Sequence, residues 1–256
     1  MTEKQYTGYV DHEYLRVLAA MVAPVKKLSY ELMEVSPQDR VLDAGCGPGV
    51  DTIPIGLEHT SGLVAGVDRD IDMLRRALDN HPPHNVTHIA ANADALPFHD
   101  AVFDACRSER LLQHLGNPAA AIRECVRVVR PGGKIVLVDT DHSTLSIDTV
   151  YTEIEWKFRT FYCQRLANGT SGRGLFRLLK EAGAKNVQVR AFPFVQHSFT
   201  ALRMVTNFDA VSADAVEQGV MSPAEAALFA DSCRELEKKG LFYSFVSVIV
   251  ADGIRQ

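Results

Sequence analysis

Short apolar segments alternate with amphipathic helical segments from residue 40 to residue 139 of this 256-residue chain. Each apolar segment has the length of a strand, and the segments between them carry apolar residues at helical spacing. Strands and helices that alternate in this way form a parallel sheet with helices on both faces. The strands are expected at residues 40–44, 63–68, 86–91, 103–107 and 134–139. The sequence therefore predicts an α/β protein with a doubly wound, mostly parallel sheet.

The regions on either side of this pattern are less regular. Residues 12–34 show helical spacing, and Pro24 is expected to kink or split that helix. Residues 143–170 are rich in aromatic side chains and show no clear strand. Two further strands are expected at residues 187–192 and 242–251, and helices at residues 174–182 and 200–240.

No flexible linker divides the chain, so we expect a single domain over residues 1–256. Its parts are an N-terminal helical arm (1–36), a ligand-binding core (37–142), two lid segments (143–170 and 195–240) and a final strand (241–256). The lid is expected to cover the carboxyl edge of the sheet, because ligands bind at that edge in folds of this type.

Composition excludes several classes of protein. A formal net charge of −5 without a basic cluster argues against a nucleic-acid partner. No stretch of about 18 consecutive apolar residues is present, so we expect no transmembrane helix. The polar N-terminus has no signal-peptide pattern, and the five scattered cysteines include no CxxC pair. We therefore expect a cytoplasmic protein with reduced thiols and no metal site.

The first expected strand runs into the sequence DAGCGPG at residues 43–49, which places three glycines at alternate positions. Glycines at such a turn allow a ligand to approach the backbone closely. The spacing differs from the GxGxxG pattern that places a pyrophosphate at a helix N-terminus. No Lys or Arg lies between Asp43 and Asp51, and Pro48 has no backbone N–H to offer a phosphate. The ligand is therefore expected to be neutral or cationic at this point.

Acidic residues follow the next two strands. Asp68 ends the second strand, where a carboxylate can accept hydrogen bonds from a ribose diol. Asp94 follows the third strand, where it can accept one from an exocyclic amine. Because the carboxyl ends of parallel strands meet at one edge, these acids and the glycine loop together predict a site for an adenosine-like ligand.

Four segments resemble the motifs of the class I S-adenosylmethionine-dependent methyltransferases. They are VLDAGCGPG (41–49), VAGVDRD (64–70), NADALPFHDAVFD (92–104) and RVVRPGGKIVLVD (127–139). The resemblance covers about residues 37–140 and is strongest to small-molecule enzymes of the ubiquinone and menaquinone type. It implies a Rossmann-like, seven-stranded sheet with an antiparallel last strand and helical lid additions. It also implies S-adenosylmethionine as cofactor and a small-molecule methyl acceptor.

The resemblance implies a cofactor-binding role for ten residues: Tyr6, Tyr9, Asp43, Gly45, Gly47, Asp68, Arg69, Asp94, Ala95 and Ser108. The glycines would pass close to the methionine moiety, Asp68 would hold the ribose and Asp94 would face the adenine amine. The backbone of Ser108 would meet the methionine ammonium. The two tyrosines would belong to an arm that closes over the cofactor.

His114, Asp141 and His142 follow the fourth and fifth strands and are candidates for a general base. A neutral imidazole can accept a proton near pH 7. Each of the three could instead be structural, as a histidine bonded to a loop carbonyl or an aspartate in a turn. Whether a base is needed depends on the acceptor, because the sulfonium of the cofactor already makes the methyl group electrophilic.

Several alternatives stay open from the sequence. The charged run from Arg107 to Arg110 fits either a polar substrate or a fixed salt-bridge network. The chain could also be an NAD(P)-dependent oxidoreductase, or a protein that binds S-adenosylmethionine without catalysis. The acceptor atom (O, N or C) and the oligomeric state are left open.

Overall fold

The computed structural model of the protein describes residues 12–58 and 61–256. Its sheet has the order β3-β2-β1-β4-β5-β7-β6. The strands are β1 (Val41–Ala44), β2 (Val64–Asp68), β3 (Val86–Ala90), β4 (Phe103–Glu109), β5 (Val129–Ile147), β6 (Lys185–Gln196) and β7 (Ser244–Ile254). Strands β1 to β5 pair in parallel, and β7 is antiparallel to both β5 and β6. The expected doubly wound, mostly parallel sheet with an antiparallel last strand is confirmed.

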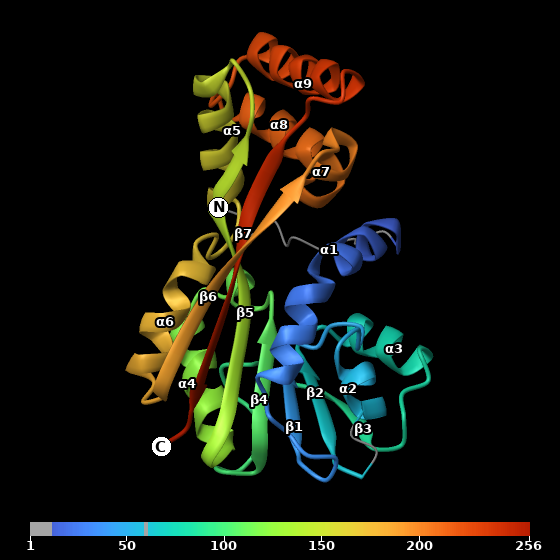
Figure 1. The fold of residues 1–256 in the computed structure, drawn as a ribbon, viewed down its shortest axis with the longest axis vertical. Coiled ribbons are helices and arrows are strands. Elements are labelled where there is room, and N and C mark those ends of the chain that lie inside the picture. Colours follow the sequence, from blue (N-terminus) through green and yellow to red (C-terminus); the bar gives the residue numbers. More distant parts are fainter. Residues whose placement is uncertain (1–11, 59–60) are drawn as a thin grey trace.

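Helices cover both faces of the sheet (Figure 1). They are α1 (His12–Glu31), α2 (Thr52–Glu58), α3 (Ile71–Asp79), α4 (Pro118–Val128), α5 (Thr152–Gln164), α6 (Ser171–Glu181), α7 (Phe199–Thr206), α8 (Phe208–Glu217), α9 (Pro223–Lys238) and the 3₁₀ helix η1 (Leu112–His114). Local sequence sets several of their ends. Asn117 caps α4 before Pro118, and Ser222 with Glu225 forms a capping box at the start of α9.

Three hydrophobic cores hold the chain together. One lies between the sheet and the helices α4 and α6, and a second lies under α1 and α2 on the opposite face. The third is built around the aromatic side chains of α5, α7, α8 and α9 and is centred on Phe158, Phe208 and Phe229. This third core forms an upper lobe beyond the carboxyl ends of the parallel strands (Figure 1).

The upper lobe stands on a long antiparallel ribbon. Strand β5 pairs with β7 from Lys134 opposite Ile254 up to Ile147 opposite Ser244, and β6 follows β7 over most of this length. The strands expected at 134–139 and 187–192 are too short, because the pairing continues past the main sheet. The strand expected at 242–251 is displaced, since β7 starts two residues later and ends three residues later. Residues 143–170, where no strand is expected from the sequence, hold the end of β5 and all of α5.

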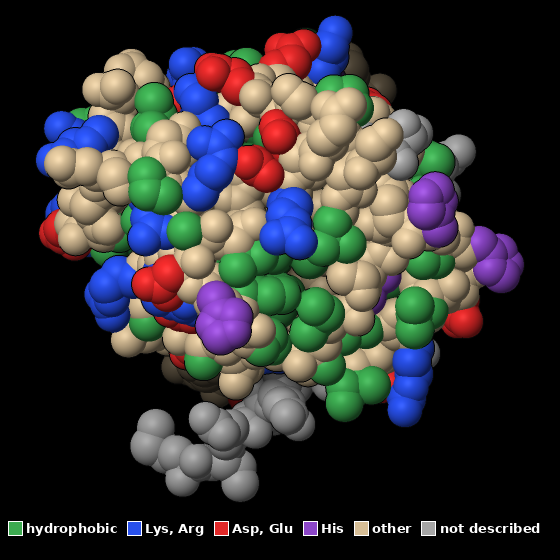
Figure 2. Space-filling model, turned by 90° about the horizontal axis from the view of Figure 1, so that it is seen from below, with side chains coloured by type: hydrophobic (Ala, Val, Ile, Leu, Met, Phe, Trp, Pro, Cys, Tyr) green, Lys and Arg blue, Asp and Glu red, His purple; other side chains and the backbone are tan. Residues whose placement is uncertain are grey.

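Helix α1 continues through Pro24 without splitting, and it bends along its length (Figure 1). Of the described helices, none is long and apolar enough to cross a membrane. The end of the molecule opposite the upper lobe shows apolar side chains beside Lys and Arg (Figure 2). That end is the amino edge of the parallel strands, away from the glycine loop.

Candidate cofactor site

The loop between β1 and α2 turns on glycines. Gly45, Gly47 and Gly49 have positive φ angles of 78°, 52° and 77°, a region that side chains disfavour. The Gly45 N–H donates to the Val67 carbonyl at 2.8 Å, which fixes the loop against β2. A Cβ at Gly45 would lie 2.9 Å from Leu111, whereas a Cβ at Gly47 would meet no atom within 4 Å. The loop is therefore packed at Gly45 and open to a ligand at Gly47.

Asp68 holds this loop at the end of β2. Its Oδ2 accepts a hydrogen bond from the Gly47 N–H at 2.8 Å, and its Oδ1 accepts one from the Asp70 N–H at 2.9 Å. The structure thus brings together two residues that the sequence assigns to the same site. Each carboxylate oxygen keeps a second acceptor position for a ligand hydroxyl.

The loop after β3 completes the edge. It starts beside Asp68, because the Ala91 N–H donates to the Asp68 carbonyl oxygen at 3.0 Å. Arg127 of α4 anchors the rest of the loop through hydrogen bonds to two of its carbonyl groups, at 2.8 and 3.2 Å. Asp94 and Ala95 are exposed on this anchored loop. They lie on the same edge as Asp68, as expected from the sequence.

A buried ion cluster lies between α1, the glycine loop and β4. We define it as Lys26, Asp43, Asp51, Arg107 and Glu109. Arg107 is at its centre and is 0% exposed. The Arg107 Nη1 atom lies 3.3 Å from Asp51 and 3.6 Å from Asp43, and Nη2 donates to Glu109. Lys26 donates to both carboxylate oxygens of Asp51 at 2.6 and 2.7 Å.

The same cluster docks α1 onto the core. The Ser29 hydroxyl accepts from Arg107 Nε at 3.0 Å, and the Tyr30 hydroxyl donates to Asp51. The Arg107 guanidinium also stacks over the Tyr30 ring, 5.0 Å from its centroid. Sequence reasoning missed the roles of Lys26, Ser29 and Tyr30. Their spacing of three and four residues was a usable signal, because it places all three on one side of a helix.

The pKa values of the two aspartates in the cluster shift in opposite directions. Burial works against ionisation of Asp51, but Arg107 and Lys26 hold its pKa well below the usual range. Burial raises the pKa of Asp43 to about 6, although Arg107 and a 2.6 Å hydrogen bond from Thr52 favour its ionised form. Two acids therefore lie at the start of α2. Their negative charge disfavours a phosphate at that helix N-terminus.

This arrangement accounts for two of the three charged residues in the run after β4. Arg107 and Glu109 belong to a fixed salt-bridge network, with Glu109 also 3.3 Å from Lys26. Ser108 between them is 2% exposed, and its hydroxyl has no hydrogen-bond partner among residues 12–58 and 61–256. Arg110 is the member of the run that reaches the surface, with 31% of its side chain exposed.

A second polar group connects the core with the upper lobe. The Gln113 side-chain amide lies 3.0 Å from His114 Nε2 and 2.9 Å from His142 Nε2. The Tyr162 hydroxyl of α5 lies 3.0 Å from His142 Nδ1. Two of the candidate bases, His114 and His142, are therefore linked through one glutamine.

The surroundings of both histidines favour the neutral imidazole. Burial lowers the pKa of His142 to about 4, and repulsion from the neighbouring Arg110 acts in the same direction. The pKa of His114 is also lowered, by partial burial and then by Arg110 and Arg69. His114 is nevertheless exposed at the surface of the site.

The third candidate base, Asp141, is engaged in an ion pair. Its carboxylate accepts from Arg173 Nε at 2.6 Å and from the Ser143 hydroxyl at 2.7 Å. Its neighbour Asp139 is 0% exposed and accepts from the backbone N–H of Gln113 at 3.1 Å. Burial raises the pKa of Asp139 to about 6.

The remaining sequence candidates are Arg69, Tyr6 and Tyr9. Arg69 is exposed at the end of β2, near enough to His114 to lower its pKa. Tyr6 and Tyr9 lie outside the described residues. Within the described part of the chain, no group of three or more His, Cys, Asp and Glu side chains could hold a metal ion.

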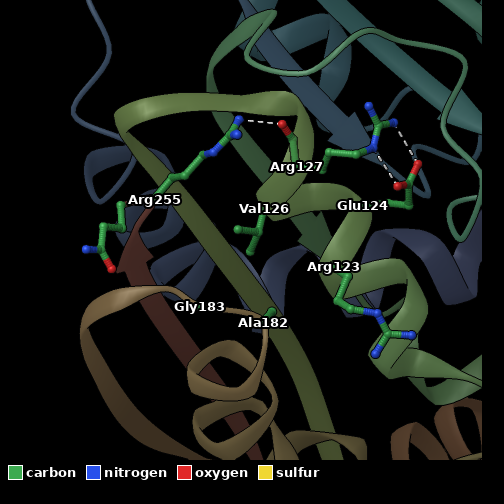
Figure 3. A pocket seen from close by; sticks show the side chains of 8 residues that line it. Arg123, Glu124, Val126, Arg127, Ala182, Gly183 and Arg255 are labelled. Atoms are coloured by element: carbon green, nitrogen blue, oxygen red, sulfur yellow. Dashed lines mark hydrogen bonds and ion pairs between the residues drawn. The ribbon is translucent and has the colours of Figure 1, made fainter.

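A depression at the other edge of the sheet contains none of these candidates (Figure 3). It is lined by Arg123, Glu124, Val126, Arg127, Ala182, Gly183, Arg255 and Gln256. Arg255 donates to the carbonyl of Arg127, and Arg127 pairs with Glu124 (Figure 3). These contacts bind the C-terminal end of α4 to the C-terminal end of the chain. This region therefore stabilises the fold at the amino ends of the parallel strands.

Known proteins share the glycine loop and the strands around it. Residues 42–137 match a family model described as a methyltransferase domain. Over 130 residues the chain is 35% identical to the demethylmenaquinone methyltransferase of Renibacterium salmoninarum, covering 50% of this chain and 53% of that one. Residues 42–137 therefore resemble a methyltransferase domain. The chain spans about half the length of the curated relatives that it matches at more than 30% identity.

Solved structures share the fold of this chain over nearly its whole length. The YcgJ protein from Bacillus subtilis has a TM-score of 0.63 at 18% identity, covering 93% of this chain and 98% of that one. A cyclase, SpnF, has a TM-score of 0.56 at 20% identity, covering 90% and 80%. These identities are low and one of the proteins is a cyclase, so the similarities show the fold only. The reaction has to be inferred from the residues of the site.

Proposed function

We propose that this chain transfers a methyl group from S-adenosylmethionine to a small-molecule acceptor. The observation that carries the proposal is the contact between the open glycine loop and the acid at the end of β2, 2.8 Å from Gly47 N to Asp68 Oδ2. Asp68 would bind the ribose hydroxyls, and Asp94 with Ala95 would bind the adenine. The methionine end would lie along Gly45 and Gly47.

The residues of the site fit this cofactor better than a dinucleotide. The start of α2, where a pyrophosphate would bind, is next to the carboxylates of Asp43 and Asp51. The backbone at Gly47 is open, and the buried Ser108 hydroxyl lacks a partner within the described chain. When bound, S-adenosylmethionine supplies an electrophilic methyl group, so the protein has to align the acceptor and exclude water.

His114 is the residue we propose as general base for an acceptor that must lose a proton. It is exposed, and its pKa is lowered, which favours the neutral form that accepts a proton. Its Nε2 atom accepts from the Gln113 amide, so Gln113 would have to release this nitrogen when the acceptor binds. Both ring nitrogens of His142 already have partners, and Asp141 is paired with Arg173. We therefore propose that His142 and Asp141 position the groups around the acceptor.

The wider organisation follows from this proposal. The arm (1–36) and the lid segments (143–170 and 195–240) would enclose an acceptor that binds between the parallel strands and the upper lobe. The five cysteines are all unpaired, which supports a location in the reducing cytoplasm. The partner would be a small molecule, and methylation at O, N or C is compatible with the site.

Replacing Asp68 with Ala tests the ribose contact. We expect the affinity for S-adenosylhomocysteine to fall by about 1–3 kcal/mol, since a charge-assisted acceptor is lost. Isothermal titration calorimetry measures this, with Asp72→Ala as control because Asp72 is an exposed acid that pairs with Arg75. Because Asp68 also holds the Gly47 N–H, Asp68→Asn should retain part of the affinity.

Two results would oppose the proposed function. Binding of NAD without binding of S-adenosylhomocysteine would favour an oxidoreductase. An affinity unchanged in Asp68→Ala would remove that residue from the site. Detection of a methylated product across a panel of metabolites separates an enzyme from a protein that only binds the cofactor.

A further inference from the structure

Arg110 occupies an unusual backbone position at the end of β4. Its φ angle is +52°, in the left-handed region that non-glycine residues rarely adopt. Its N–H donates to the Val138 carbonyl at 2.8 Å, which holds the residue in this conformation. Strained positions of this kind persist where the surroundings enforce them and are common at functional sites. The bend directs the chain from β4 toward η1 at the carboxyl edge.

The guanidinium of Arg110 keeps most of its hydrogen-bonding capacity free. Its Nε atom lies 3.5 Å from Glu109 Oε1, and it makes no hydrogen bond within residues 12–58 and 61–256. Glu109 is already shared with two other cations. Arg107 donates to its Oε2 atom, and Lys26 lies 3.3 Å from its Oε1 atom. Arg110 therefore retains unpaired donors in a fork that matches a carboxylate.

The polar groups that lead from Arg110 toward the upper lobe are uncharged. Arg110 directly precedes Leu111, whose side chain packs against Gly45 of the glycine loop, and it lies four residues before His114. His142 continues through Tyr162 to the upper lobe. An anion on Arg110 would therefore meet uncharged imidazole, amide and phenol groups there. The neighbouring carboxylates are already engaged: Glu109 pairs with Arg107, Asp141 pairs with Arg173, and Asp68 accepts from the glycine loop.

We propose that Arg110 binds a carboxylate of the methyl acceptor, so that the substrate of this chain is an organic acid. This inference rests on the proposed function, because it places the acceptor beside the methyl group of the cofactor. The carboxylate would lie over the end of β4, and the rest of the acceptor would extend along Gln113 and His142 toward the lobe. The cofactor has a carboxylate of its own, and the experiment must separate the two.

The test compares small acids with their amides on the protein saturated with S-adenosylhomocysteine. The probes are benzoate with benzamide, 4-hydroxybenzoate with its amide, and indole-3-acetate with its amide, measured by ligand-observed NMR titration. At least one acid should bind roughly ten- to a hundredfold more tightly than its amide, the range expected for hydrogen bonds to a charged group. Arg110→Gln should remove this preference, and Arg110→Lys should keep part of it.

Arg123→Gln is the matched control. Arg123 is an exposed arginine of α4 that lines the depression at the opposite edge of the sheet. This variant removes the same charge from the protein, so a general effect of net charge would appear in both variants. The acid preference should be unchanged in Arg123→Gln.

Three outcomes would overturn the inference. The first is that no acid binds better than its amide, and the second is that the preference survives in Arg110→Gln. The third is that Arg110→Gln weakens S-adenosylhomocysteine but not 5′-methylthioadenosine, which lacks the amino-acid end, because Arg110 would then hold the cofactor carboxylate. Failure of wild type to bind S-adenosylhomocysteine would instead count against the proposed function, and the acid preference can still be measured on the free protein.

Discussion

Arg107→Met is expected to lower the free energy of unfolding by about 3–5 kcal/mol. The substitution keeps the volume of the side chain similar but removes the cation at the centre of the ion cluster. Asp43 and Asp51 are 2% and 9% exposed, and the Glu109 side chain is 4% exposed. Water cannot replace the lost guanidinium at such sites. Asp43 loses its nearest cation, and Asp51 and Glu109 are left to share the single charge of Lys26.

Urea unfolding at neutral pH, followed by circular dichroism, measures this effect. Arg177→Met is the control, because Arg177 pairs with Glu181 on the exposed face of α6, and such a pair contributes about 0.5 kcal/mol or less. If Arg107→Met does not fold, Lys26→Met provides an intermediate case, since it leaves Arg107 in place. A loss below about 1 kcal/mol in Arg107→Met would contradict the central role of this residue.

The cluster also connects stability with binding. Asp43 and Asp51 flank the glycine loop, and Glu109 is the last residue of β4 before Arg110. A change at Arg107 therefore disturbs one wall of the cofactor site and the residue that we propose for the acceptor. The same contacts dock α1 through Lys26 and Tyr30, so the first described helix and the glycine loop are expected to open together.

The parallel half of the fold could be predicted from the sequence because local signals determine it. Apolar segments such as 64–68 and 135–138 are short and buried on both faces, and capping residues such as Asn117 mark helix starts. The glycine loop was predictable for the same reason. Positive φ angles at Gly45 and Gly47 restrict these positions to glycine, so the residue type itself reports the turn.

The upper lobe and the ion cluster could not be predicted in this way. The length of β5 depends on its pairing with β7, about a hundred residues later in the chain, and no local pattern encodes that register. The partners of Arg107 come from α1, the glycine loop and β4. A charged residue in a strand indicates an exposed or functional side chain, and only the three-dimensional arrangement shows that this one is fully buried.

Asp139→Asn is expected to change how stability depends on pH. Burial raises the pKa of Asp139 from 3.8 to about 6 in the folded state, a difference that corresponds to ~3 kcal/mol. Because the folded pKa is the higher one, the protonated form favours folding. This contribution is complete below about pH 4 and is lost as the pH rises through about 6. The stability of wild type relative to Asp139→Asn should therefore fall by up to ~3 kcal/mol over this range.

The measurement is a series of urea unfolding curves for both proteins between about pH 4.5 and 7.5. Subtracting the two proteins cancels the titration of the ion cluster, since it is the same in both. At high pH the ionised form is still held by the N–H groups of Gln113 and Thr140, so Asp139→Asn is expected to be destabilised as well as less sensitive to pH.

Asp104→Asn serves as control. The hydrogen bonds from Arg40 and Arg130 outweigh burial and lower the pKa of Asp104, so its titration is complete below this range and its curve should run parallel to that of wild type. Parallel curves for Asp139→Asn would show that its carboxyl titrates normally and is reached by water.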